Sequence, residues 1–118
     1  MMSRPLGFAH EDAALAYLQK QGLHLVTRNF SCKLGEIDLI MQEQAKLVFV
    51  EVRYRASKRY GGPAASVSRG KQMRIIRTAQ WFLRAHFPGR PPSCRFDVIA
   101  IEGAHQADFN WIKNAFYA

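Results

Sequence analysis

The chain has 118 residues, of which 48% are hydrophobic, and this length suits one globular domain spanning residues 1–118. It contains no run of about 18 apolar residues, which excludes a transmembrane helix, and Glu11 and Asp12 interrupt the apolar stretch that a signal peptide needs. A cytoplasmic location is therefore expected. Neither Cys32 nor Cys94 belongs to a zinc-binding pattern, and both are expected to be free thiols.

Positive charge dominates the chain, with a net charge of +8, and it is unevenly distributed. No acidic residue occurs between Glu51 and Asp97, while arginine and lysine recur throughout that interval. Such segregation is typical of a protein that binds a polyanion, and arginine suits phosphate geometry. The predicted nucleic-acid-binding residues are Arg55, Lys58, Arg59, Arg69, Lys71, Arg74 and Arg77. A solvated basic surface, or one that meets an acidic protein, is the alternative interpretation.

The first half of the chain predicts one helix followed by three strands. Apolar residues at helical spacing predict a helix over 7–21, which Gly22 is suited to end. The segments 23–30, 36–41 and 47–55 are predicted to be strands.

In the second half, a loop containing glycine and proline leads to a long predicted helix at 69–87, with Ser66 or Ser68 as its N-cap. Residues 94–101 alternate as in a strand, and 109–116 predict a short strand or a helical end. This order of elements predicts an α/β domain with a small mixed sheet flanked by helices.

Three carboxylates stand at positions where apolar residues would be expected. Glu51 and Arg53 share one face of the strand 47–55, and both faces of this strand are largely apolar. Asp38 lies within the apolar strand that should pair with it, and Glu11 lies in the apolar stripe of the first helix. A carboxylate in such a position costs free energy unless it is paired or bound to a metal.

A shared cation would explain all three carboxylates. Two carboxylates about 4 Å apart repel by roughly 4 kcal/mol at an effective dielectric constant near 20. Oxygen ligands favour Mg²⁺ or Mn²⁺ over zinc, so Glu11, Asp38 and Glu51 are predicted to hold such an ion. With a basic cleft, this describes metal-assisted hydrolysis of a phosphodiester. Structural ion pairs of Glu51 with Arg53, or of Glu11 with Arg53 or Lys33, are the alternative.

The segments GEIDLI and LVFVEVRYR resemble the PD-(D/E)xK nuclease pattern, in which an acid precedes a hairpin and an acid-x-base follows in a hydrophobic strand. Over nearly its full length the chain resembles the YraN-type family of bacterial proteins, through GFAHEDAALAYL, these two segments and CRFDVIAI. That family is similar to archaeal Holliday junction resolvases. The resemblance implies a restriction-endonuclease-like core and metal-dependent cleavage of DNA.

The resemblance also assigns roles to particular residues. It implies that Glu11 is the first-helix acid, that Asp38 and Glu51 bind the metal, and that Arg53 stands in place of the motif lysine. Arginine can supply positive charge to the phosphate, but it does not lose its proton and so cannot be a general base.

The function expected from sequence is that of a Mg²⁺-dependent endonuclease acting on branched or otherwise structured DNA. Its catalytic residues would be Glu11, Asp38, Glu51 and Arg53. Branched DNA would suit a homodimer with one active site per strand. Two alternatives stay open: a nucleic-acid-binding module of the same fold that does not cleave, and a basic adaptor protein.

Overall fold

The computed structural model describes residues 6–55, 67–103 and 108–118, together with the side chains from residue 9 onward in these ranges. The elements in chain order are α1 (Leu6–Lys20), β1 (His24–Cys32), β2 (Gly35–Glu43), β3 (Lys46–Arg55), α2 (Arg69–His86), β4 (Cys94–Glu102) and β5 (Asp108–Phe116). The strands form one sheet in the order β1-β2-β3-β4-β5, in which only β3 and β4 run parallel. The predicted α/β class with a mixed sheet is confirmed, and the C-terminal tail is a strand.

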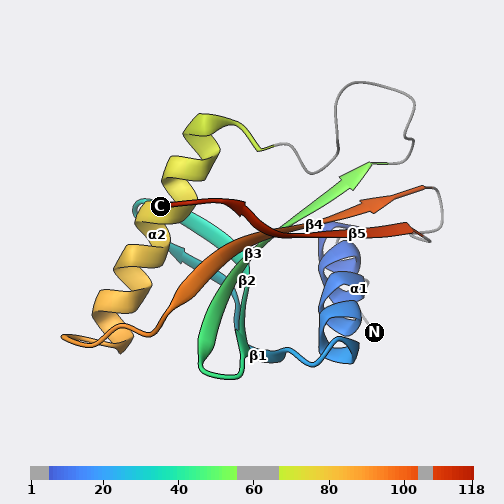
Figure 1. The fold of residues 1–118 in the computed structure, drawn as a ribbon. Coiled ribbons are helices and arrows are strands. Elements are labelled where there is room, and N and C mark those ends of the chain that lie inside the picture. The colour runs from blue at the N-terminus through green and yellow to red at the C-terminus, as the bar shows by residue number, and fades with distance from the viewer. Residues whose placement is uncertain (1–5, 56–66, 104–107) are drawn as a thin grey trace, which may run out of the picture.

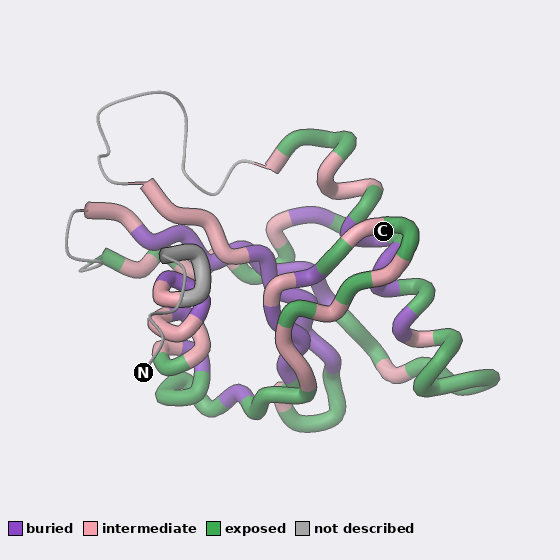
Figure 2. The backbone as a smooth tube through the Cα atoms, turned by 180° about the vertical axis from the view of Figure 1, so that it is seen from behind, coloured by how far each residue is buried: buried purple, intermediate pink, exposed green. Residues whose placement is uncertain are grey.

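The two helices lie on opposite sides of the sheet (Figure 1). On one side, apolar residues of α2 such as Ile75 and Phe82 pack against Phe49 and Phe96 of the parallel strands. On the other side, Leu18 of α1 packs in a second apolar cluster with residues of β2, β3 and β4. Figure 2 shows the central strands as the most continuously buried part of the backbone. Because both faces are covered, β3 is a central strand, as its apolar sequence predicts.

Local sequence signals set the ends of both helices. Gly22 follows α1 with a φ of 99°, and the N–H of Leu23 donates to the carbonyl of Leu18 at 3.1 Å, as in a glycine-terminated helix. Ser68 caps α2, accepting a hydrogen bond from the backbone N–H of Lys71 at 3.2 Å. No helix in residues 6–55, 67–103 and 108–118 is long and apolar enough to cross a membrane. Cys32 and Cys94 are free thiols, as predicted.

Strand β5 is held to β4 by a buried carboxylate. Asp97 is fully buried and accepts hydrogen bonds from the Nε of Arg95 at 3.1 Å, the indole Nε1 of Trp111 at 2.9 Å and the backbone N of Asn114 at 3.0 Å. The register of β4 and β5 shifts beside Asp97, and Asn114 adopts a φ of 54°. The Asp97 carboxylate thus accepts the backbone N–H of Asn114, which the irregular ladder leaves without a strand partner. Arg95 also binds Glu43 at 2.6 Å, which connects β4 to the end of β2.

Strands β2 and β3 separate part-way along their length, and this separation creates the site. Their ladder runs from Glu43 and Lys46 to Leu39 and Val50. Beyond that point β2 continues pairing with β1, while β3 continues pairing with β4. The first residue past the last pair is Asp38 on β2 and Glu51 on β3.

Candidate active site

Asp38 and Glu51 meet where β2 and β3 part. Oδ2 of Asp38 accepts the backbone N–H of Val52 at 2.8 Å, so a carboxylate replaces the missing ladder partner. Glu51 is only 5% exposed. Burial raises the pKa of Asp38 to about 8, and the charge of Glu51 and a hydrogen bond between the two carboxyl groups act in the same direction. The structure therefore brings together two of the three predicted carboxylates, and their mutual repulsion is expressed in that pKa.

Lys71 completes this cluster from the first turn of α2. Its Nζ lies 2.6 Å from Oε2 of Glu51, while its side chain stays 40% exposed. The ammonium thus reaches the buried carboxylate from the solvent side. A protonated amine beside two acids supplies both a positive charge and hydrogen-bond donors.

The cluster opens into a pocket of about 230 Å³ between the sheet and α2. Its walls are formed by Gly35, Glu36, Asp38, Glu51, Lys71, Arg74 and Ile75. Gly35 has a φ of 152°, and a Cβ placed on it would lie 3.0 Å from Oγ1 of Thr78. Glycine is therefore needed for the start of β2 to approach α2 so closely. The pocket therefore combines the buried acid Glu51 with the more exposed basic side chains of Lys71 and Arg74.

Glu11 approaches from α1 and is largely buried, as its place in the apolar stripe predicts. Its Oε1 accepts a hydrogen bond from Nη2 of Arg28 at 3.2 Å, and the same guanidinium binds Asp12 at 2.8 Å through Nη1. The charge of Glu11 also contributes to the raised pKa of Asp38, which places it within electrostatic range of that group.

The ion pairs considered from sequence differ from those in the structure. Among the described ion pairs, Glu51 is joined to Lys71 rather than to Arg53, and Glu11 is joined to Arg28 rather than to Arg53 or Lys33. The guanidinium of Arg28 comes from β1, which lies next to α1 in the chain, so a short connection brings it to Glu11.

The carboxylate oxygens that meet where β2 and β3 separate are suitable ligands for a hard divalent cation. No group of three or more acidic, histidine or cysteine side chains with metal-site geometry occurs among the described residues. The pair Asp38 and Glu51 nevertheless matches Mg²⁺, which commonly uses one or two protein carboxylates and completes its shell with water and phosphate oxygens. A cation there would also remove the repulsion that raises the pKa of Asp38.

Comparison with known proteins identifies the family. The sequence model of the uncharacterised protein family UPF0102 matches residues 10–101. The chain belongs to this family. The UPF0102 protein of Herminiimonas arsenicoxydans is 57% identical over 110 residues, covering 93% of this chain and 85% of that protein. The UPF0102 protein of Coxiella burnetii is 48% identical over 114 residues, covering 97% and 93%. The resemblance to the YraN-type family is confirmed, and the matched region contains Glu11, Asp38, Glu51 and Lys71.

The arginine at the motif lysine position lies beside this UPF0102 site. Arg53 is half-buried two residues beyond Glu51 on β3, opposite Ala100 of β4. The described residues that line the pocket do not include Arg53. Its predicted catalytic role therefore stays a prediction, whereas the nearest described cation to Glu51 is Lys71.

The predicted nucleic-acid-binding residues fall into four groups. Arg69, Arg74 and Arg77 are exposed on α2, and Arg74 also lines the pocket. Lys71 lies within the site itself. Arg55 is half-buried at the end of β3, where its backbone carbonyl accepts the N–H of Gly103 at 2.9 Å. Lys58 and Arg59 lie outside the described residues.

Lys71 is among the residues predicted to bind phosphate, and its contact with Glu51 was not predicted. One signal in the sequence could have shown it. Lys71 lies in the first turn of a helix, where the helix dipole disfavours a cation, and that turn contains no acidic residue. A lysine there needs an anion from elsewhere in the fold, and the only buried acid of the neighbouring predicted strand was Glu51.

Proposed function

We propose that this UPF0102 protein is a metal-dependent endonuclease that hydrolyses phosphodiester bonds in DNA. The observation that supports the proposal most directly is the cluster of Asp38, Glu51 and Lys71 in one pocket. Paired acids with an adjacent amine suit hydrolysis of a phosphodiester, because the reaction needs a bound cation, an oriented water and a positive group for the phosphate. The net charge of +8 supports a polyanionic substrate.

Asp38 and Glu51 are the proposed ligands of Mg²⁺ or Mn²⁺. When bound there, the cation would lower the pKa of a coordinated water and neutralise charge on the phosphate. Asp38 is held in place by its hydrogen bond from Val52, and Glu51 by its ion pair with Lys71. Glu11 is proposed as the third carboxylate of the site, held by Arg28 and close enough to influence Asp38.

The basic residues of the pocket have separate proposed tasks. Lys71 would donate hydrogen bonds to a phosphate oxygen or to the attacking water, because its exposed side chain reaches from solvent to Glu51. Arg74, at the same pocket, would bind a neighbouring phosphate. Arg53 keeps its proposed role of stabilising charge in the transition state, which would require its guanidinium to turn toward the bound phosphate.

A nucleic-acid-binding module that does not cleave is the second candidate. The contact of 2.6 Å between Lys71 and Glu51 favours it, because an ammonium already neutralises the acid that a cation would otherwise bind. In that case the acids would be structural, and the basic surface would carry the whole function.

Cleavage of labelled DNA distinguishes the two candidates. Four-way junctions, flaps, single strands and linear duplexes would each be incubated with Mg²⁺, Mn²⁺ or EDTA. The nuclease is expected to cut at least one of these substrates with Mg²⁺ or Mn²⁺ and none with EDTA. Binding without cutting in every combination would favour the module. Affinity that does not fall as the salt concentration rises would contradict both.

A further inference from the structure

An exposed basic stripe runs along the outer side of α2 and begins at the pocket that contains the acidic cluster. Arg74, Arg77, Trp81 and Arg84 follow one another at spacings of three, four and three residues, which places them on one side of the helix. All four are exposed, and Trp81 is 48% exposed. The exposed Trp81 is thus flanked by cations, and α2 contains no acidic residue.

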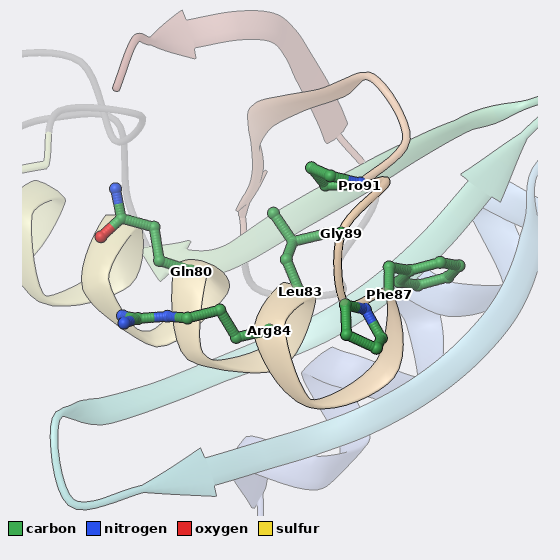
Figure 3. Close-up of a pocket in the computed structure, with 7 residues that line it drawn as sticks. Gln80, Leu83, Arg84, Phe87, Gly89 and Pro91 are labelled. Atoms are coloured by element: carbon green, nitrogen blue, oxygen red, sulfur yellow. The ribbon is translucent and has the colours of Figure 1, made fainter.

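The stripe connects two places on the surface. At its start, Arg74 lines the pocket that contains Asp38 and Glu51. At its end, Trp81, Arg84 and Ala85 line a hollow of about 250 Å³, and Arg84 also borders a groove of about 370 Å³ with Phe87. In Figure 3 the side chains of Gln80 and Arg84 extend from α2 in the same direction. Ten residues separate Arg74 from Arg84, which is about 15 Å along the helix axis.

We infer that this stripe binds an unpaired strand of DNA next to the cleaved phosphate, with one base stacked on Trp81. The arginines match the repeating negative charge of the backbone, and about 15 Å spans roughly four phosphates at the spacing of stacked DNA. The indole ring can stack on the flat face of any base, whatever the DNA sequence. This inference rests on the proposed nuclease function and names the substrate class: DNA with a single-stranded segment, such as a flap or an open branch point.

A fully paired duplex fits the stripe less well. Inside a duplex each base face is covered by its neighbours, so an exposed indole gains nothing from stacking. A second copy of this chain also fits poorly, because pairing α2 with another α2 would bring Arg74, Arg77 and Arg84 of each copy together with no acid on either helix. An unpaired strand would contact both the arginines of the stripe, through its phosphates, and the ring of Trp81, through a base.

Equilibrium binding to fluorescent oligonucleotides tests the inference. It would be measured in EDTA, so that binding is read without cleavage, with a ten-nucleotide single strand of DNA and a blunt duplex of the same length. Trp81→Leu is expected to weaken binding of the single strand by about tenfold, the scale of one base stacked on an aromatic ring. It should leave duplex affinity within about twofold. Trp81→Phe, which keeps an aromatic face, should restore most of the affinity.

The arginines of the stripe are tested by salt dependence. Arg84→Gln should reduce the slope of log affinity against log salt for the single strand by about 0.7, the contribution of one phosphate contact. Lys20→Gln, which removes one positive charge at the exposed end of α1, is the matched control and should not change the slope. Quenching of the Trp81 fluorescence by the single strand should disappear in Trp81→Phe.

Each contrary result has its own meaning. Equal loss of single-strand and duplex affinity in Trp81→Leu, or no loss in either, would overturn the stacking inference. If the wild-type protein nevertheless cuts DNA, the proposed nuclease function would still stand. A protein that dimerises through α2, so that Trp81→Leu makes it monomeric in sedimentation experiments, would also overturn the inference. The same would follow if a single strand of RNA bound more tightly than the DNA strand.

Discussion

The ammonium of Lys71 lies 2.6 Å from the carboxylate of Glu51, and this ion pair joins the first turn of α2 to the middle of the central strand β3. It links the acidic cluster, which is built into the sheet, to the basic surface, which belongs to the helix. The pocket with both characters exists because α2 crosses the sheet where β2 and β3 separate.

Replacing Lys71 by methionine is expected to slow DNA cleavage by about 10²- to 10³-fold, the usual cost of removing one donor that stabilises developing charge. Single-turnover rates at saturating protein would separate this loss from weaker binding. Arg69→Gln is the matched control, because it removes an exposed cation from the same helical turn. That variant should lose affinity and keep its rate at saturation.

The opposite result for Lys71 and Arg53 would assign the catalytic role to Arg53 of β3. If Arg53→Gln abolishes cleavage and Lys71→Met does not, then the arginine at the motif position supplies the essential charge. The contact between Lys71 and Glu51 would in that case be structural.

The raised pKa of Asp38 predicts how stability depends on pH in the metal-free protein. In the unfolded chain an aspartate has a pKa of about 3.9, whereas in the fold burial and Glu51 raise it to about 8. Between these values the folded state binds a proton that the unfolded state does not. The free energy of unfolding should therefore fall as the pH rises from about 4 to about 8.

Urea denaturation at several pH values within this window measures the effect. In Asp38→Asn the free energy of unfolding should vary less with pH. Relative to wild type, this variant should be more stable at pH 8 than at pH 5. Saturating Mg²⁺ should stabilise the wild type more at pH 8 than at pH 5, because a cation binds the ionised carboxylate. An unchanged slope in Asp38→Asn would show that another group titrates there.

The buried carboxylate of Asp97 is expected to be structural. Asp97→Ala removes the partner of Arg95, Trp111 and the backbone of Asn114, and should cost about 3–5 kcal/mol of unfolding free energy because it leaves a buried cation poorly paired. Trp111→Phe removes one hydrogen bond to Asp97 and part of a ring that contacts Tyr17, and should cost less than Asp97→Ala, about 1–2 kcal/mol. Denaturant titration gives both values. A small loss in Asp97→Ala would mean that Glu43 alone suffices for Arg95.

Much of the fold could be predicted from the sequence because its signals are local. The end of α1 at Gly22, the cap of α2 at Ser68 and the two apolar faces of β3 depend on residues close together in the chain. The unusual position of Asp38 and Glu51 was also visible, because an acid in an apolar strand stands out. These signals singled out two acids that the structure places side by side.

The rest depends on contacts between distant segments. No local pattern shows that β2 and β3 separate after Leu39 and Val50. The first turn of α2, which lacks an acid, indicates only that Lys71 needs a distant anion, and the fold supplies Glu51 from twenty positions earlier in the chain. The alternative of an ion pair between Glu11 and Arg53 or Lys33 likewise did not include Arg28, because the placement of β1 against α1 decides which cation lies nearby. Strand β5 could not be told from a helical end because its buried and exposed residues do not alternate regularly.

The proposed nuclease activity requires Asp38 and Glu51 to hold a cation that serves phosphodiester hydrolysis. The most direct test compares wild type and Asp38→Asn on the same labelled flap or junction, with cleavage measured in Mg²⁺ and binding measured in EDTA. Asp108→Asn, which changes an exposed acid at the start of β5, is the control. Wild type and the control are expected to cut in Mg²⁺, and Asp38→Asn is expected not to cut although it binds equally well. Equal cutting by all three proteins, or cutting that persists in EDTA, would contradict it.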